Sequence, residues 1–269
     1  MKKILFLLVL FCAAPFVRAA QVDTLRVESP SMQKAIEVVV IIPDLAAREQ
    51  CPVVYLLHGL GGNARTWISI KPNLPEIADE EGFIFVCPDG AKSWYWDSPL
   101  NADMKYETFI SSELVQYVDS HYRTIADSRA RAITGLSMGG HGAMWNAIRH
   151  PEVFSAAGSM SGGVDIRPFP KNWNISDQLG TQDAHPENWE NYTVVHLVPA
   201  MKPGKLALIF DCGETDFFHD VNVDFHRALL KQGIDHDFIT RPGNHDEKYW
   251  KNAIDYQLLF FKKHFSREY

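Results

Sequence analysis

Cysteine is scarce in this chain of 269 residues, and its spacing excludes two kinds of scaffold. Of the four cysteines, one falls in an apolar run at the start of the chain, and Cys51, Cys87 and Cys212 are far apart. An odd remainder with no Cys-x-x-Cys pair excludes a disulfide framework and a zinc ribbon. One disulfide stays open as an alternative, but positions in or beside apolar runs favour free thiols in a core.

Lysine and arginine are also fewer than aspartate and glutamate. The chain has 26 Lys and Arg against 33 Asp and Glu, which gives a formal net charge of −7. Nucleic acids and anionic membrane surfaces are polyanions that bind through clustered lysine and arginine. We therefore expect neither of them as a partner, and we expect a small-molecule or oligosaccharide ligand instead.

A long apolar run occurs at the start of the chain, where residues 4–14 follow Lys2 and Lys3 and end at Pro15. The run is shorter than the roughly 20 residues that a membrane-spanning helix needs. Small residues before a cleavage point near Ala19 complete the pattern of a signal peptide, with a retained anchor as the alternative. We expect cleavage of residues 1–19, which moves the net charge to −10, and export to the bacterial periplasm or beyond.

The rest of the chain, residues 20–269, alternates β-rich runs with helical stretches and contains no internal repeat. Such alternation is typical of a single α/β domain with a mostly parallel sheet and helices on both faces. An antiparallel opening pair is expected at 22–29 and 35–42. Six further strands are expected at 53–57, 83–87, 130–134, 154–160, 206–210 and 236–240.

Helical periodicity predicts four helices, at residues 103–121, 138–149, 221–232 and 246–264. Each stretch repeats apolar residues at the spacing that forms one helix face. Residues 161–202 break the alternation, with four prolines, two tryptophans and mixed polar residues. We interpret this segment as an insertion over the carboxyl edge of the sheet.

The segment Gly135-Leu136-Ser137-Met138-Gly139 lies directly between an expected strand and an expected helix. A serine nucleophile must stand on a sharp turn where a base can reach its hydroxyl, and small neighbours let strand and helix approach each other. The five-residue pattern alone is weak evidence, because a glycine-rich turn can hold an incidental serine. Its position between strand and helix makes Ser137 the predicted nucleophile.

Stabilising the oxyanion of an acyl-transfer reaction needs two backbone N–H donors. The residue after the nucleophile normally supplies one, and the loop after the third strand supplies the other. We therefore assign the donors to Met138 and to Leu60 in the loop His58-Gly59-Leu60-Gly61-Gly62. His58, at the strand end, is interpreted as a brace for this loop and not as a catalytic group.

The general base is expected last in chain order, after the acid. Among eleven histidines, His245 follows the last strand and precedes the last helix, at the edge of the sheet that carries Ser137. His219 and His236 are the alternatives, but one falls near a helix start and the other inside a strand. We predict His245 as the base.

The acid that orients the base should lie on the loop after strand 206–210, which carries four candidates. Asp211 is too close to the strand, and Asp220 is placed to cap the next helix. Asp216 is central in the loop and precedes Phe217-Phe218, which could shield a buried carboxylate. We predict Asp216, with Glu214 as the competitor.

Five motifs, taken in order, resemble the esterase D superfamily. They are 58–62 (HGLGG), 106–114 (YETFISSEL), 135–140 (GLSMGG), 211–218 (DCGETDFF) and 243–246 (GNHD). That superfamily includes carbohydrate esterases of family one, S-formylglutathione hydrolases and antigen 85 mycolyltransferases. The resemblance implies an α/β-hydrolase fold with an eight-stranded sheet, a triad of Ser137, Asp216 and His245, and neither metal nor organic cofactor.

Several aromatic residues are candidates for substrate contacts. Trp94, Tyr95 and Trp96 follow the end of strand 83–87, and Trp173 and Trp189 lie in the insertion. Aromatic faces stack on sugars and on cinnamoyl rings, although large aromatics serve equally well as core. We expect Trp94, Tyr95, Trp96 and Trp189 to contact substrate, with packing of the loops as the alternative.

These observations predict a secreted serine esterase for acetyl or feruloyl esters of plant-derived carbohydrates. A general short-chain acyl esterase, an acyltransferase and a peptidase are alternatives on the same scaffold. A non-catalytic binding protein on a hydrolase fold is the alternative from another class.

Overall fold

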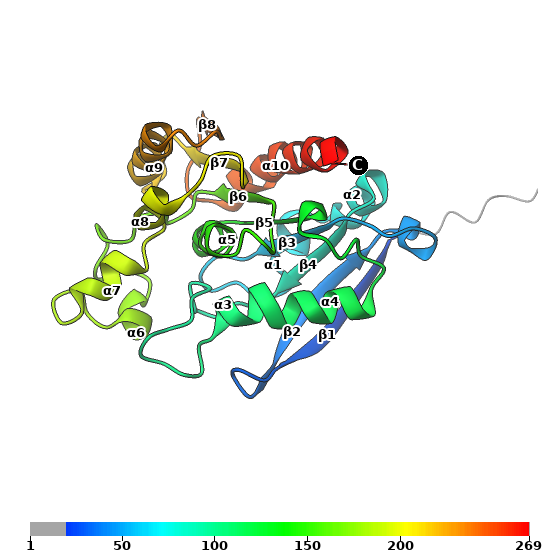
Figure 1. The fold of residues 1–269 in the computed structure, drawn as a ribbon, viewed down its shortest axis with the longest axis horizontal. Helices are drawn as coiled ribbons and strands as arrows, with labels where there is room; N and C mark the ends of the chain where they lie inside the picture. The colour runs from blue at the N-terminus through cyan, green and yellow to red at the C-terminus, as the bar shows by residue number, and fades with distance from the viewer. Residues whose placement is uncertain (1–19, 269) are drawn as a thin grey trace, which may run out of the picture.

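The computed structural model describes residues 20–268, which form an eight-stranded sheet flanked by helices (Figure 1). The strand order is β1-β2-β4-β3-β5-β6-β7-β8. The strands are β1 (Gln21–Ser29), β2 (Lys34–Ile42), β3 (Val53–Leu57), β4 (Ile84–Pro88), β5 (Arg131–Gly135), β6 (Ala156–Met160), β7 (Ala207–Gly213) and β8 (Asp237–Arg241). The two opening strands are antiparallel, β2 is antiparallel to β4, and every other pairing is parallel.

Helices cover both faces of the sheet. They are α1 (Thr66–Ile70), α2 (Leu74–Glu81), α3 (Tyr106–Thr108), α4 (Leu114–His121), α5 (Met138–Arg149), α6 (Ile175–Leu179), α7 (Pro186–Asn191), α8 (Val194–Leu197), α9 (His219–Gln232) and α10 (Glu247–Glu268). One apolar cluster joins α4, α5 and α9 to alternate strand residues, and a second joins α1, α2 and α10 to the residues between them. The predicted mainly parallel α/β sheet with two covered faces is confirmed.

The differences from the expected elements are local. The helix expected at 103–121 begins at Tyr106 and contains a π-helical turn, Phe109–Glu113, between α3 and α4. Helices α1 and α2 were not predicted, because each is too short to repeat a helical pattern clearly. The insertion at 161–202 carries α6, α7 and α8 and lies beside α5 and α9 in Figure 1.

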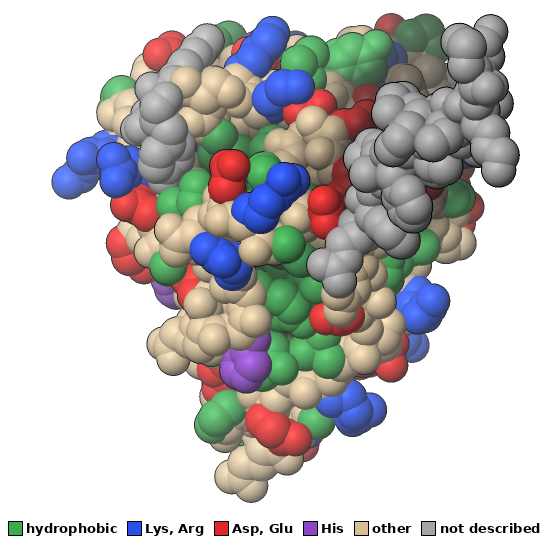
Figure 2. All heavy atoms as spheres, turned by 90° about the vertical axis from the view of Figure 1, so that its right-hand side faces the viewer, with side chains coloured by type: hydrophobic (Ala, Val, Ile, Leu, Met, Phe, Trp, Pro, Cys, Tyr) green, Lys and Arg blue, Asp and Glu red, His purple; other side chains and the backbone are tan. Residues whose placement is uncertain are grey.

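The state of the cysteines and the kinds of side chain on the surface are consistent with the sequence. Cys51, Cys87 and Cys212 are buried free thiols, which confirms the interpretation as core residues. On the face shown in Figure 2, acidic and basic side chains are interspersed with apolar ones. Between residues 20 and 268, no helix is long and apolar enough to cross a membrane. The proposed signal peptide, 1–19, lies outside the described residues.

A buried carboxylate ties the π-helical region to α5. Glu107 accepts hydrogen bonds from Trp145 Nε1, Arg149 Nε and His150 Nε2 at 2.7, 2.7 and 2.8 Å. Burial alone would raise the pKa of Glu107, but these three hydrogen bonds outweigh it and lower the pKa below 4.5. The hydrogen bond that His150 donates to Glu107 raises the pKa of His150 above 6.5.

We expect Glu107→Gln to lower the free energy of unfolding by about 1–3 kcal/mol, because it removes the charge shared by a buried indole, a half-buried imidazole and an exposed guanidinium. The contribution of a carboxylate with a lowered pKa is lost as the pH falls through that pKa, and the His150 contribution is lost as the pH rises through its raised pKa. The difference between wild type and variant should therefore be largest between these two pKa values.

Urea unfolding at several pH values measures this difference. Glu187→Gln is the matched control, since its side chain is 63% exposed and its one ion pair among the described residues is with His185, at 3.7 Å. It should change stability by less than about 0.5 kcal/mol. Equal effects of the two substitutions would show that the Glu107 cluster does not stabilise the fold.

Candidate active site

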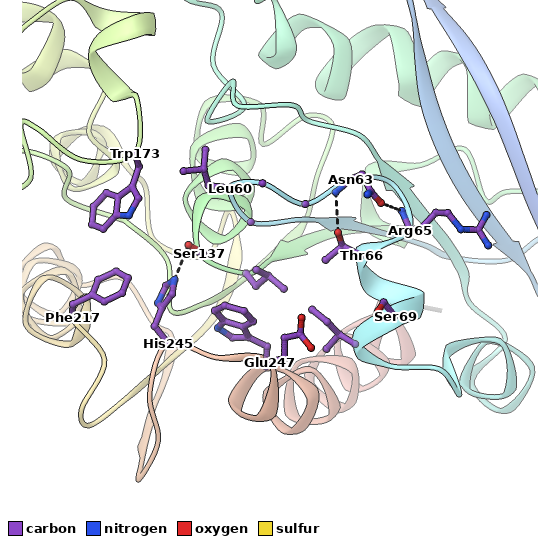
Figure 3. Close-up of a pocket in the computed structure, with 16 residues that line it drawn as sticks. Leu60, Asn63, Arg65, Thr66, Ser69, Ser137, Trp173, Phe217, His245 and Glu247 are labelled. Carbon is purple, nitrogen blue, oxygen red and sulfur yellow. Dashed lines mark hydrogen bonds between the residues drawn. The ribbon is translucent and has the colours of Figure 1, made fainter.

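The carboxyl ends of the parallel strands surround a cavity of about 760 Å³. It is lined by Gly59–Asn63 after β3, Arg65–Thr66 and Ser69–Ile70 at α1, Leu136–Ser137 after β5, Trp173 from the insertion, Phe217 after β7, and His245, Glu247 and Trp250 after β8. In Figure 3, Ser137 stands at the centre, with Trp173 and Phe217 on one side and Asn63 and Arg65 on the other. Open α/β sheets commonly bind ligands at this edge.

Ser137 stands on the sharp turn between β5 and α5. Its backbone has φ 55° and ψ −118°, a region that non-glycine residues rarely adopt. The backbone N–H of Ser137 donates to the Met160 carbonyl at 2.9 Å, which holds the turn against β6. The strain directs the hydroxyl away from the backbone and toward the cavity.

The flanking glycines are required by close approach of the backbone. A Cβ on Gly135 would lie 2.5 Å from the Gly139 carbonyl carbon, and one on Gly139 would lie 2.3 Å from the Leu57 oxygen. Main-chain atoms at these distances cannot move aside as a side chain could. The predicted role of both glycines, to let strand and helix approach, is confirmed.

We expect Gly139→Ala to displace Ser137 and to lower kcat/KM about 100-fold, since a shift of about 1 Å at reacting atoms can have that effect. Its melting temperature should fall as well, because the added methyl overlaps main chain. Gly204→Ala is the control: its φ is +73° but an added Cβ meets nothing, so it carries only the backbone cost. Full activity in Gly139→Ala would contradict this account of the turn.

His245 connects the serine to a carboxylate. Its Nε2 lies 2.9 Å from Ser137 Oγ, and its Nδ1 lies 2.9 and 3.1 Å from the two carboxylate oxygens of Asp216. These are hydrogen-bond distances, in the order hydroxyl, imidazole, carboxylate. The structure thus brings together the three residues that the sequence analysis selected.

Hydrogen bonds between the loop after β7 and the loop after β8 support this arrangement. Thr215 donates to the Gly243 carbonyl from its backbone N–H at 3.1 Å and from its hydroxyl at 2.7 Å. Glu214 N–H donates to the Arg241 carbonyl at 2.9 Å. The loops that carry Asp216 and His245 are therefore fixed relative to each other before substrate arrives.

Asp216 is buried beneath aromatic rings. Its Oδ1 accepts a hydrogen bond from the Phe218 N–H at 2.8 Å, and Phe217 and Phe218 lie 4.2 and 5.5 Å from the His245 ring. The ring of Trp250 stands perpendicular to the His245 ring, with centroids 5.0 Å apart. The expected shielding by the phenylalanines is confirmed, and it keeps water from competing for the Asp216–His245 hydrogen bonds.

The alternative acids and bases lie elsewhere. Asp211 is buried within β7 and bonds to Gln257, while Glu214 and Asp220 are exposed. Phe218, and not Asp220, holds the N-cap position of α9, so the expected cap is wrong. His236 bonds to His226, and His219 contacts Asp220.

Of the two assigned oxyanion donors, Leu60 lines the cavity, and Met138 directly follows Ser137. Met138 is the first residue of α5, where a helix leaves its N–H groups without internal acceptors. Leu60 lies in the glycine-rich loop and lines the cavity beside Ser137 (Figure 3). Within residues 20–268, neither N–H meets a hydrogen-bond acceptor. Both N–H groups are therefore available to a negatively charged oxygen.

His58 braces the loop that carries Leu60. The buried ring contacts the Gly59 carbonyl through Nδ1 at 2.7 Å, and its Nε2 accepts from the Gly90 N–H at 2.7 Å. Asp89 Oδ1 lies 3.3 Å from Nε2. The interpretation of His58 as a structural residue is confirmed.

The expected contacts of Trp94, Tyr95, Trp96 and Trp189 with substrate are wrong. All four side chains are at most 1% exposed and none of them lines the cavity. Trp94 and Trp96 stack at 5.7 Å, and Trp96 packs against His141, whose pKa burial lowers to about 3. Large apolar rings gain more by filling the space between the insertion and α5 than by facing water.

Two other aromatic residues line the cavity instead. Phe217 is 50% exposed, and Trp173 from the insertion stacks on it with centroids 5.3 Å apart and planes at 24°. Figure 3 shows the pair beside His245. Phe217 could have been selected from the sequence, since it directly follows the predicted acid. For Trp173, the sequence indicates only that it is one of two tryptophans in the insertion.

Over the described range, 20–268, no three or more His, Cys, Asp or Glu side chains are grouped to hold a metal ion.

Comparison with known proteins places the chain in a family. The Esterase family model matches residues 29–261. The chain belongs to this esterase family. The family and the α/β-hydrolase fold that the sequence resemblance implied are thereby confirmed.

Individual members of the esterase family extend the comparison. Esterase Rv1288 of Mycobacterium tuberculosis is 31% identical over 237 residues, covering 77% of this chain and 51% of that protein. This chain therefore spans about half the length of that relative. An acetyl esterase of Caldicellulosiruptor saccharolyticus is 25% identical over 218 residues, covering 77% of this chain and 81% of the other. A solved ferulic acid esterase superposes with a TM-score of 0.79 at 29% identity, covering 92% and 99% of the two chains.

Proposed function

We propose that this protein is a serine esterase that hydrolyses acetyl or feruloyl esters of plant-derived carbohydrates outside the cytoplasm. The observation that carries the proposal is the hydrogen-bonded series Ser137, His245 and Asp216 at the wall of an open cavity. Two backbone N–H groups without acceptors complete the requirements of acyl transfer. The apolar run and small residues at positions 1–19 support export.

The first step forms an acyl-enzyme. His245 Nε2 accepts the Ser137 proton as Oγ attacks the ester carbonyl carbon, and the carbonyl oxygen becomes an oxyanion held by the N–H groups of Leu60 and Met138. Asp216 keeps the proton on Nδ1, so that Nε2 is free to accept, and it stabilises the imidazolium that forms. The carbon–oxygen bond to the alcohol then breaks, and Nε2 gives its proton to the leaving oxygen.

The second step releases the acid. A water molecule gives a proton to His245 Nε2 while its oxygen attacks the acyl carbon, and the same two N–H groups again hold the oxyanion. When the bond between Ser137 Oγ and the acyl carbon breaks, Nε2 returns the proton to Oγ. Each turnover consumes one ester and one water and yields one acid and one alcohol.

The substrate class is proposed from the lining of the cavity. Trp173 and Phe217 offer a flat apolar surface beside His245, and Asn63, Thr66 and Ser69 offer polar groups opposite. Flat faces stack on aromatic acyl groups and on the apolar faces of sugars, and polar groups bind sugar hydroxyls. The likeness to a ferulic acid esterase and to an acetyl esterase supports the same class.

A matched panel of esters tests this proposal: acetyl, butyryl and feruloyl groups, each on methanol and on a xylo-oligosaccharide. We expect sugar-linked acetyl or feruloyl esters to have the highest kcat/KM. In Trp173→Ala, KM for the preferred ester should rise about two- to tenfold, while that for methyl acetate, which has no flat face, should not change. Preference for butyryl esters regardless of the alcohol would indicate a general short-chain esterase. Transfer to an added sugar in place of water would indicate an acyltransferase.

A further inference from the structure

A second cavity, of about 400 Å³, adjoins the catalytic one. Asn63 and Arg65 line both, so the two spaces meet around the loop after β3. In Figure 3, Arg65 lies at the far side of the catalytic cavity from His245, with its guanidinium directed toward the paired strands β1 and β2. Arg26 and Lys34, from those strands, line the second cavity together with Tyr106. Its volume lies within the range of about 300–1,000 Å³ that is typical of ligand sites.

Three cationic side chains therefore line this cavity, although the formal net charge of the chain is −7. Arg26 Nη2 donates to the Ala35 carbonyl at 2.9 Å, and Arg65 Nη1 donates to Thr24 Oγ1 at 3.2 Å. Both arginines are exposed and use one nitrogen of each guanidinium in these bonds. Across the described residues, no carboxylate lies within 4 Å of either guanidinium or of Lys34 Nζ. Their remaining N–H donors are free to bind a ligand.

Lys34 is the most enclosed of the three. Its Nζ donates to the Asp103 carbonyl at 2.7 Å and lies 5.0 Å from the centre of the Tyr106 ring. Desolvation by burial lowers the pKa of Lys34, although Asp103 and Asp89 act in the opposite direction. An anion in the cavity would offset that desolvation, so the ammonium favours an anionic ligand over a neutral one.

The two acids that line the cavity, Glu37 and Asp89, do not neutralise its three cationic side chains. Asp89 Oδ1 already contacts His58 Nε2 at 3.3 Å and accepts from the Ala91 N–H at 2.8 Å. The Ala91 N–H therefore holds this oxygen against the loop after β4. Glu37 lies opposite Arg26 in the register of β1 and β2 but forms no ion pair with it within 4 Å. Three cations and two carboxylates suit a ligand that carries both an anionic group and hydroxyls.

We propose that this cavity is a subsite for a uronic acid residue in the alcohol part of the substrate, so that the preferred esters are those of acidic oligosaccharides. The inference rests on the proposed esterase activity and deepens it. The sugar carboxylate would bind Arg26, Lys34 and Arg65, and the sugar hydroxyls would donate to Glu37 and Asp89. Guanidinium groups bind carboxylates through paired N–H donors, which gives direction as well as charge.

The test compares two acetylated oligosaccharides that differ only in one uronosyl residue. We expect wild type to have a higher kcat/KM for the acidic ester, through a lower KM, and this preference should shrink as ionic strength rises. In Arg26→Gln/Lys34→Gln the ratio of acidic to neutral kcat/KM should fall about three- to tenfold, since each exposed charge contact is weak by itself. Lys231→Gln, which removes a cation from α9, should keep the wild-type ratio.

Each outcome decides the proposal. Equal kcat/KM for the two esters in wild type, or a ratio that the double substitution does not alter, would overturn it. A preference that disappears equally in Lys231→Gln would mean that overall charge, and not this cavity, attracts the acid. Hydrolysis of p-nitrophenyl acetate by wild type is measured in parallel: its absence would refute the esterase activity itself, whereas its presence with no acidic preference would refute only the subsite.

Discussion

Replacing Ser137 with alanine is expected to lower kcat for ester hydrolysis by about 10⁴–10⁶-fold, because no other group in the cavity replaces the nucleophile. The Ser137 hydroxyl lies 2.9 Å from the only base that faces it among the described residues, His245. The remaining rate would come from water activated by His245 beside the two backbone N–H groups. The measurement is steady-state hydrolysis of p-nitrophenyl acetate by the purified variant.

The melting temperature provides the control for this experiment. Alanine matches the shape of serine apart from one oxygen, and the turn is held by the Ser137 N–H bond to Met160, which the substitution keeps. We therefore expect a melting temperature within a few degrees of wild type. Undiminished hydrolysis by a folded Ser137→Ala protein would refute the catalytic proposal, and would favour either another nucleophile or a contaminating enzyme.

Asp216→Asn is expected to lower kcat by about 10³–10⁴-fold while KM changes little. The carboxylate bonds His245 Nδ1 through both oxygens and is buried among aromatic rings. An amide of the same shape would lose the negative charge that stabilises the imidazolium, and its NH₂ group would favour the tautomer that places the proton on Nε2. His245 would then fail to accept the serine proton.

The matched control for Asp216→Asn is Glu214→Gln, two residues away in the same loop. Glu214 is exposed, and its backbone N–H donates to the Arg241 carbonyl. We expect kcat within about twofold of wild type, as for most surface substitutions. If Glu214→Gln lost activity and Asp216→Asn did not, the competitor that the sequence left open would be the acid.

The predicted triad depended on topology more than on motif. Ser137, Asp216 and His245 each follow a parallel strand, and the carboxyl ends of parallel strands lie at one edge of a sheet. Strand periodicity placed β3 at its observed limits and the other strands within a few residues. Once these strands were placed, few histidines or acids remained that could reach Ser137, so local sequence was enough to choose among them.

The exposure of the aromatic residues could not be predicted from strand order in the same way. Their exposure depends on where the segment 161–202 folds, and that segment consists of short helices with little periodicity. It covers Trp94 and Trp96 and brings Trp173 onto Phe217. A tryptophan after a strand is equally suited to stacking on substrate and to packing under a loop. Only tertiary contacts decide between the two.

The central claim is that Ser137 carries the acyl group between the two steps. Mass spectrometry of the protein, quenched within milliseconds of mixing with p-nitrophenyl acetate and then digested, tests it most directly. We predict an acetyl group on the peptide that contains Ser137, transient in wild type and absent in Ser137→Ala. Turnover with the acetyl group on another residue, or with no covalent intermediate in a variant that retains activity, would contradict the account.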